Sequence, residues 1–218
     1  TIVAWFSLLP ESMVNFSESA LSSIFFNSNH YFWITGQKYG EETGLLVPLL
    51  HTWSLSIEEQ FYIFFPIILL FIFRFNKKNI ILFIFIMIIS SFCAAIFAAG
   101  KFPMFNFYIL PTRGWELLVG SLIATIKLLK IEKQKYNSKI FIKYLPSLGL
   151  LLIIYSIFFI DNPTFHPSAY TLVPIIGSCL IIFFTKENEM IHKLLSNKLF
   201  VSIGLISYSL YLWHYPIF

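Results

Sequence analysis

Charged residues are scarce in this chain. Only 12% of its 218 residues are Asp, Glu, Lys or Arg, whereas 57% are hydrophobic and 19% are aromatic. A soluble domain of this length has too little interior to bury so much apolar surface. The composition therefore indicates an α-helical membrane protein. A β-barrel would alternate in segments of about 10 residues, whereas the apolar runs here are continuous.

Cysteine is almost absent, and the motifs of several enzyme classes are missing. Cys93 and Cys179 both fall inside apolar runs, so we expect small buried side chains and neither a disulfide nor a metal site. The chain has no P-loop, no dinucleotide-binding glycine fingerprint, and no HExxH, GxSxG or CxxC motif. ATP hydrolysis, nicotinamide redox chemistry and zinc chemistry are therefore not supported. The net charge of +4 is divided among separate segments, which gives no indication of nucleic-acid binding.

The apolar runs predict an all-α transmembrane bundle with about six spans. We place these spans near residues 56–74, 80–99, 111–129, 144–160, 170–185 and 200–218, after a truncated N-terminal stub. Residues 10–26 have the opposed faces of an amphipathic helix that lies in the membrane interface, and residues 27–50 are expected to form an external loop. The chain lacks an initiator Met and both ends are apolar, so we expect it to be part of a longer membrane domain.

Positive charge predicts how the spans are oriented. The connections on one side carry three basic residues at 74–78, six at 127–143 and three at 186–198, which makes twelve. The alternate connections carry only Lys38, Lys101 and Arg113. The positive-inside rule assigns the basic side to the cytoplasm. Eight of the eleven acidic residues then fall on the external side.

The most informative motif is His51-Thr-Trp-Ser-Leu-Ser-Ile-Glu-Glu-Gln-Phe-Tyr62, which opens an apolar run with an imidazole and two adjacent carboxylates. An ionised side chain at the centre of a bilayer costs about 2.5–3.5 kcal/mol, so such residues usually have a function. We predict catalytic roles for His51, Glu58 and Glu59. The alternative for Glu59 is structural, because Ser56-Ile-Glu-Glu59 fits the capping-box pattern of a helix N-terminus.

A second polar motif, Pro111-Thr-Arg-Gly-Trp-Glu-Leu-Leu118, opens another span from the external side. Arg113 and Glu116 are three residues apart, so an ion pair on the helix surface is one interpretation. The other is that Arg113 holds an anionic group or one of the two carboxylates of the first motif, a task that suits a planar guanidinium. We predict that both residues belong to the catalytic site.

The last span carries a polar stripe, because Ser207, Tyr211 and His214 are spaced i, i+4, i+7. Such a stripe usually faces the interior of a helix bundle. It either makes hydrogen bonds between helices or lines a path for substrate or protons. We predict substrate-binding roles for these three residues and for Trp53.

At these residues the sequence resembles acyltransferase family 3, membrane O-acyltransferases that modify bacterial cell-surface glycans. The resemblance rests on three segments in the family's order, His51–Tyr62, Leu110–Leu118 and Leu205–His214. It is strongest for the branch in which an SGNH-type esterase domain often follows the membrane domain. The resemblance implies transfer of an acyl group, most often acetyl, from acetyl-CoA or another acyl-CoA to a hydroxyl. The acceptor would be a cell-surface polysaccharide, a lipopolysaccharide or a lipid-linked glycan.

The resemblance also implies a location and partners. The protein would lie in the bacterial inner (cytoplasmic) membrane with its polar cluster outside, contact membrane lipid and the glycan, act with a fused or separate SGNH-type domain, and need no metal. The family's opening helices, with a histidine held to be catalytic, would precede Thr1, so we expect the general base there. Two alternatives stay open: a transporter or flippase for glycan intermediates, and a fragment that is inactive alone.

Overall fold

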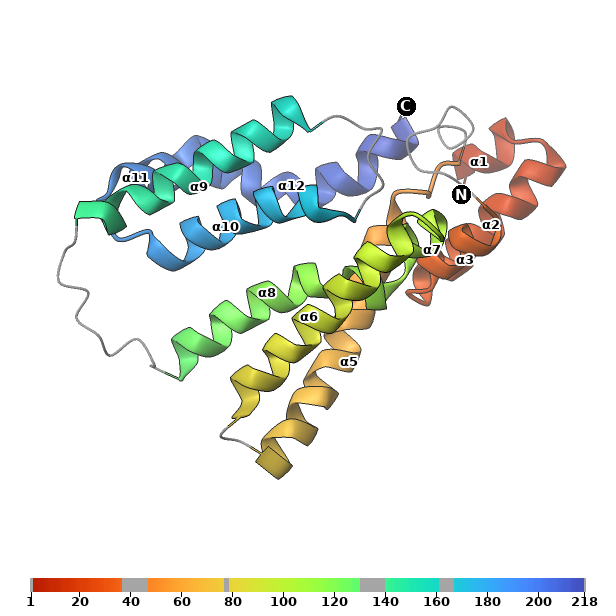
Figure 1. Cartoon of the computed structure of the whole chain (residues 1–218). Helices are drawn as coiled ribbons and strands as arrows, with labels where there is room; N and C mark the ends of the chain where they lie inside the picture. Colours follow the sequence, from red (N-terminus) through yellow and green to blue (C-terminus); the bar gives the residue numbers. More distant parts are fainter. Residues whose placement is uncertain (1, 37–46, 77–78, 130–139, 161–166, 218) are drawn as a thin grey trace. The chain divides into compact units, whose positions relative to one another are not determined.

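The computed structural model describes residues 2–36, 47–76, 79–129, 140–160 and 167–217. Every regular element in these ranges is a helix, which confirms the all-α prediction (Figure 1). In chain order the elements are α1 (Ile2–Ser7), α2 (Pro10–Ile24), α3 (Ser28–Ile34), α5 (Thr52–Asn76), α6 (Ile80–Ala99), α7 (Pro103–Tyr108), α8 (Leu110–Leu128), α9 (Ile140–Phe159), the 3₁₀ turn η2 (Ala169–Thr171), α10 (Leu172–Phe184), α11 (Met190–Leu195) and α12 (Lys198–Ile217).

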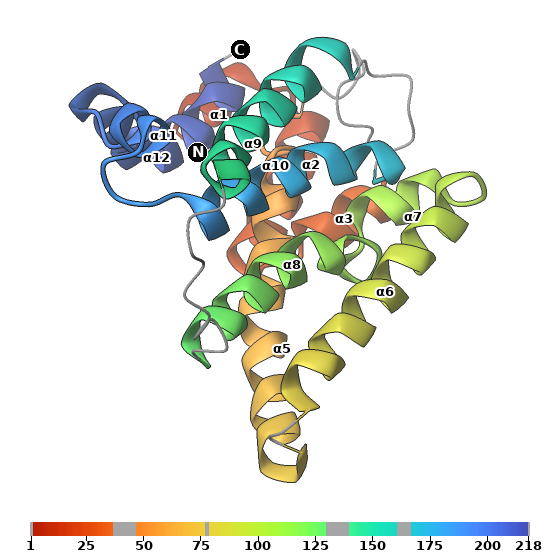
Figure 2. The same cartoon turned by 60° about the vertical axis from the view of Figure 1, so that its left-hand side comes forward.

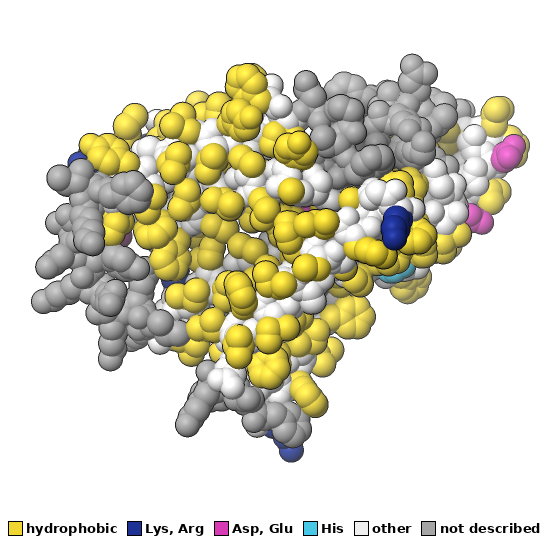
Figure 3. Space-filling model, viewed as in Figure 1, with side chains coloured by type: hydrophobic (Ala, Val, Ile, Leu, Met, Phe, Trp, Pro, Cys, Tyr) yellow, Lys and Arg dark blue, Asp and Glu magenta, His cyan; other side chains and the backbone are white. Residues whose placement is uncertain are grey.

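Among the described residues, three segments are long and apolar enough to cross a membrane: Thr52–Arg74, Ile80–Ala99 and Ile142–Phe159. Their apolar side chains largely project outward, as Leu70 and Ile157 do with 72% and 71% of their surface exposed. In the space-filling view, hydrophobic side chains cover most of the visible described surface (Figure 3). So much exposed apolar surface is unfavourable in water and is expected where lipid surrounds the helices. The chain is a membrane protein.

Helices also form over the other predicted spans. α8 and α12 are 19 and 20 residues long, and α10 is a shorter apolar helix, so their crossing of the membrane stays a prediction. α2 begins at Pro10, where the amphipathic helix was expected, and its interfacial position also stays a prediction. The predicted loop over 27–50 contains helix α3, whereas residues 37–46 of that loop lie outside the described residues.

The described chain forms two compact units. The first consists of Thr1–Ile67, Tyr108–Leu110 and Ile206–Phe218, and the second consists of Ile68–Phe107 and Pro111–Leu205. In the first unit, three polar side chains one turn apart on α5 bond to side chains of α2 and α3. These hydrogen bonds join Ser23 to Thr52 at 2.8 Å, Ser28 to Ser56 at 2.7 Å and Gln60 to Asn29 at 2.8 Å. The bonds fix α2 and α3 beside the beginning of α5, where the first predicted motif lies.

In the second unit, α9 and α10 run side by side in both views (Figures 1 and 2). The two backbones meet at Gly149 and Gly177. A Cβ atom added at Gly149 would lie 2.5 Å from the carbonyl oxygen of Gly177, and one added at Gly177 would lie 2.7 Å from the oxygen of Gly149. Small residues at such a crossing let membrane helices approach closely and gain van der Waals contact.

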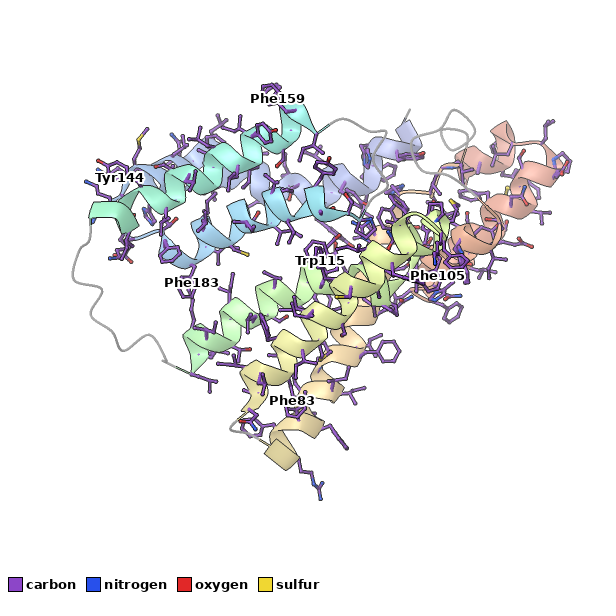
Figure 4. The ribbon with its side chains drawn as sticks, in the orientation of Figure 1. Phe83, Phe105, Trp115, Tyr144, Phe159 and Phe183 are labelled. Carbon is purple, nitrogen blue, oxygen red and sulfur yellow. The ribbon has the colours of Figure 1, made fainter. Side chains whose placement is uncertain are left out.

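A second contact of this unit joins α6 to the start of α8. The Ser91 hydroxyl donates to the carbonyl of Pro111 at 2.6 Å and accepts from the backbone N–H of Trp115 at 3.0 Å. The Trp115 side chain, labelled in Figure 4, meets the Phe92 ring edge to face at 5.0 Å. Trp115 is therefore part of the packing that fixes the first turns of α8.

Candidate active site

The first unit buries an imidazole where α5 begins. His51 directly precedes the first helical residue and has only 1% of its surface exposed. Three rings of α12 surround it at centroid distances of 5.5 Å for Tyr211, 5.3 Å for His214 and 5.4 Å for Tyr215. The structure therefore brings together His51, Tyr211 and His214, which the sequence analysis assigned to separate motifs. We call these four rings the imidazole cluster.

Tyr211 holds this cluster in place. Its hydroxyl donates to the carbonyl of His51 at 2.7 Å and also makes a short hydrogen bond with the Ser54 hydroxyl. A phenol has one proton, so Ser54 is the donor of the second bond. The hydroxyl thus ties α12 to the first turn of α5. This contact gives Tyr211 a positioning role, whereas its predicted role in substrate binding stays a prediction.

The neutral form of His214 has a defined tautomer. Its Nδ1 lies 2.6 Å from the backbone carbonyl oxygen of Tyr211. A carbonyl oxygen can only accept a hydrogen bond, so Nδ1 must carry the proton. In the neutral ring, Nε2 then carries the lone pair. A histidine held in this way has the arrangement of a general base.

His51 is kept uncharged. Burial, reinforced by the neighbouring His214, lowers the pKa of His51 to about 4, although the backbone of Leu212 favours the protonated form slightly. Neither ring nitrogen makes a hydrogen bond of ordinary geometry with the described residues. Leaving a buried polar group without such a bond costs about 1–3 kcal/mol. His51 is therefore a buried polar side chain that is kept at a cost in stability.

The two carboxylates of the motif lie inside α5, not at its end. Because α5 begins at Thr52, Ser56 is a helix-interior residue, and its hydroxyl bonds to Ser28. The capping-box interpretation of Glu59 is therefore wrong. Glu58 and Glu59 are both half-buried, and neither forms an ion pair or hydrogen bond with another described residue. Their catalytic roles stay predictions.

Trp53 and Ser207 differ from the members of the cluster. The ring of Trp53 is buried and packs edge to face against Tyr108 at 5.6 Å, as a core residue does. The side chain of Ser207 is exposed on α12. Only two residues of the predicted stripe therefore belong to the imidazole cluster, and the substrate-binding roles of Trp53 and Ser207 stay predictions.

Arg113 and Glu116 lie in the second unit, on the first turns of α8. Their side chains form the predicted i,i+3 ion pair, with Nη2 and Oε2 3.0 Å apart and exposed fractions of 18% and 21%. The guanidinium also lies 5.5 Å from the centre of the Phe107 ring. The other oxygen of Glu116 is buried without a hydrogen bond to a described residue. The ion pair is confirmed, and the catalytic roles of both residues stay predictions.

Two residues at this site, Ser54 and Tyr215, were not predicted from the sequence. The sequence contained a clue to both residues, because Ser54 lies three residues after His51 in the same motif and Tyr215 directly follows His214. What could not be seen was that the two motifs meet. Within the described ranges, no three His, Cys, Asp or Glu side chains are grouped so that they could hold one metal ion.

Lipid-facing helices, with a buried histidine at the start of α5 beside a part-buried histidine of α12, define a helical membrane protein with a candidate site for proton transfer. Comparison with known protein families identifies the family within this class. Residues 19–218 match the family model described as an acyltransferase domain. The chain belongs to this family, and the resemblance to acyltransferase family 3 is confirmed.

Curated relatives of this chain are named O-acetyltransferases. The O-acetyltransferase OatA of Staphylococcus aureus (strain NCTC 8325 / PS 47) is 31% identical over 99% of this chain and 37% of its own length. The peptidoglycan O-acetyltransferase OatA of Listeria monocytogenes serovar 1/2a is 29% identical over 95% of this chain and 35% of its own length. The chain thus spans little more than a third of these relatives. No solved structure matches it.

Proposed function

We propose that this protein is a membrane O-acyltransferase that moves an acyl group, acetyl in the first instance, from acyl-CoA to a hydroxyl of a cell-surface glycan. The observation that carries the proposal is the similarity of 99% of the chain to a relative named O-acetyltransferase. One relative is named a peptidoglycan O-acetyltransferase, so peptidoglycan is the first acceptor to test.

The imidazole cluster supports this chemistry. A sugar hydroxyl is a weak nucleophile at neutral pH, and a general base must take its proton during attack on the acyl carbon. The resemblance assigns a base to a histidine upstream of Thr1, and the described chain supplies two further imidazoles, His51 and His214. A carboxylate such as Glu58 would stabilise a ring that becomes positively charged.

The proposed location follows from the distribution of charge. A cytoplasmic face that is rich in Lys would attract the anionic nucleotide of acyl-CoA, and the acyl group would be delivered to an acceptor outside the inner membrane. The glycan, the membrane lipid and an SGNH-type domain, fused or separate, are the proposed partners. No step of the proposal requires a metal.

The direct test uses membranes from cells that make the full-length protein. These membranes are supplied with acetyl-CoA labelled in the acetyl group and with peptidoglycan fragments. We expect label in the glycan that mild base releases as acetate, because O-acetyl esters are base-labile. Movement of glycan across the membrane without any labelled ester would instead identify a transporter and refute the proposal.

The same assay tests the role of Glu58 in the first motif. Glu58→Gln keeps the size of the side chain and removes its charge, so we expect transfer to fall at least 100-fold, a common magnitude for losing one electrostatic partner of the transition state. Glu18 of α2, which bonds the exposed Tyr31 hydroxyl, provides the control Glu18→Gln. Full transfer by a well-folded Glu58→Gln protein would remove Glu58 from the mechanism.

A further inference from the structure

The connection between α10 and α12 contains a short helix that has no part in the proposed acyl transfer. This helix, α11 (Met190–Leu195), belongs to the second unit, and Ile191 is its buried residue, with 5% of its surface exposed. We propose that α11 is an anchor in the membrane interface and that Lys193 and Lys198 bind the anionic headgroups of the adjacent lipid leaflet. By the predicted orientation, this leaflet is the cytoplasmic one. The inference is independent of the chemistry that the protein performs.

The first observation is the apolar surface that α11 leaves uncovered. Met190 and Leu194 are one helical turn apart and have 79% and 38% of their surfaces exposed. On either side along the chain, Ile182 near the end of α10 and Leu199 in the first turn of α12 are 57% and 66% exposed. Such a surface is unfavourable in water. A short helix with this exposed face is suited to lie at the boundary between headgroups and acyl chains.

The second observation is the sign of the charges beside this surface. From Met190 to Phe218 the sequence contains two lysines, Lys193 and Lys198, and no Asp or Glu. Both lysines are exposed. A lysine can lay its apolar stem along an apolar surface and keep its ammonium among the headgroups. Because an anionic leaflet attracts basic residues at its surface, these two charges favour anionic over neutral lipid.

The carboxylates of the connection lie in the turn before α11. Glu189 accepts the backbone N–H of Lys186 on its Oε2 at 3.3 Å, and its own carbonyl accepts the backbone N–H of Lys193 at 2.9 Å. Asn188 has a φ of 69°, in the left-handed region that suits a tight turn. Glu187 is exposed at the same turn. The acidic residues are therefore separated along the chain from the lysines of α11 and α12.

The two lysines are also held on an ordered piece of chain. The carbonyl of His192 accepts the backbone N–H of Ser196 at 2.8 Å, which closes the end of α11. Asn197 then caps α12, because its Oδ1 accepts the backbone N–H of Leu199 at 3.1 Å. Lys198 thus lies in the first turn of a capped helix. Ordering before binding reduces the entropy that is lost when a headgroup binds.

Fluorescence quenching tests where α11 lies in the full-length protein. Cys93→Ala and Cys179→Ala provide a background without the described cysteines. A fluorescent label is then attached to Met190→Cys, to Leu194→Cys or, as the matched control in the turn, to Glu187→Cys. In nanodiscs that contain phosphatidylglycerol, we expect lipids with a nitroxide near the headgroup to quench the labels at 190 and 194. A water-soluble nickel chelate should quench the label at 187.

Two results of this experiment would overturn the inference. If the nickel chelate quenches the labels at 190 and 194 as strongly as the label at 187, α11 lies in water. If neither quencher reaches the labels at 190 and 194, protein and not lipid covers the helix.

The contribution of the lysines is measured on the unchanged protein, so that no variant has to fold. A water-soluble reagent acylates exposed amines, and mass spectrometry of the peptides gives the rate at each lysine. The attraction of one lysine to an anionic lipid surface shifts a binding equilibrium about 5-fold. Lys193 and Lys198 should therefore react about 5-fold more slowly in phosphatidylglycerol than in phosphatidylcholine nanodiscs. Lys101, whose ammonium lies 4.4 Å from the centre of the Phe97 ring, is the reference.

The same comparison of lipids gives a decisive result for the headgroup. Equal rates at Lys193 and Lys198 in the two kinds of nanodisc would refute their binding of anionic lipid. In the quenching experiment, Lys193→Gln combined with Lys198→Gln should weaken the lipid quenching at 190, whereas Lys101→Gln should leave it unchanged.

Discussion

The buried polar residues of the first unit differ in whether their side chains are hydrogen-bonded. Asn29 is buried with both ends of its amide engaged, because it donates to the Tyr108 carbonyl at 2.9 Å and accepts from Gln60 at 2.8 Å. His51 is equally buried and has no bond of ordinary geometry with the described residues. Asn29 therefore contributes to stability, whereas His51 is maintained at a cost to stability, as expected of a group kept for function.

Replacing Asn29 tests the first of these tasks. Asn29→Ala removes a donor to the buried Tyr108 carbonyl and one of the two acceptors of the Gln60 amide, which keeps the Phe26 carbonyl, so we expect the free energy of unfolding to fall by about 1–3 kcal/mol. Thermal unfolding of the purified protein in detergent measures the loss. Asn15→Ala, which removes an exposed amide of α2, is the control. Equal stability of the two variants would contradict the role given to Asn29.

His51 predicts how stability depends on pH. Its pKa is about 4 in the folded protein and near 6.5 in the unfolded chain, so only the unfolded state gains a proton between these values. The free energy of unfolding therefore has its full value above pH 6.5 and falls as the pH drops toward 4. The expected loss is up to about 3 kcal/mol, since one pKa unit corresponds to about 1.4 kcal/mol. His51→Phe should flatten this part of the stability curve. A curve of the same slope in the variant would show that other groups cause the loss.

At the scale of elements, close backbone contact distinguishes some helix pairs from others. α9 and α10 approach so closely at Gly149 and Gly177 that neither position has room for a methyl group. Gly120, on α8, has no atom within 4 Å of an added Cβ. A side chain added at Gly149 or Gly177 therefore meets a neighbouring backbone, whereas one added at Gly120 does not.

Gly149→Ala should force α9 and α10 apart. The added Cβ would meet the Gly177 carbonyl oxygen at 2.5 Å, and we expect a loss of about 1–3 kcal/mol, the usual cost of overpacking. The melting temperature in detergent provides the measurement, with Gly120→Ala as the control. A melting temperature that is unchanged in Gly149→Ala would show that the helices do not meet at this glycine.

The elements also show which parts of the fold were predictable. The run at 80–99 became α6 with the predicted ends, because long apolar segments are recognisable from local sequence. α5 begins at Thr52, four residues before the predicted start, because Thr52 and Ser56 bond to α2 and α3. α3 was expected to be a loop, since its seven residues have no clear apolar period and depend on these same bonds.

At the scale of the whole molecule, the membrane determines orientation. The twelve-to-three distribution of Lys and Arg predicts that the segment 127–143 is cytoplasmic. Its central residues 130–139 lie outside the described residues. Lys127, at the end of α8, donates to the Ile182 carbonyl at 2.6 Å, near the labelled Phe183 (Figure 4). In the second unit the ends of α8 and α10 therefore meet.

A reporter fusion tests the orientation. A phosphatase that is active only outside the cytoplasm, fused after Lys135, should be inactive, whereas the same fusion after Lys101 should be active. The reason is that Lys135 lies in the basic connection and Lys101 in a connection with little charge. The reverse pattern would invert the proposed topology and place the imidazole cluster on the cytoplasmic side.

The amino-acid sequence alone determined that this protein is helical, that it lies in a membrane and that it belongs to its family, because apolar composition and contiguous motifs are local properties. Only the tertiary structure decided that His51 and His214, which are 163 positions apart in the chain, lie in contact, with their ring centroids 5.3 Å apart. It also decided that Tyr211 holds them there and that Ser207 does not join them. Pairing between distant helices depends on which surfaces pack together, and no local pattern contains that information.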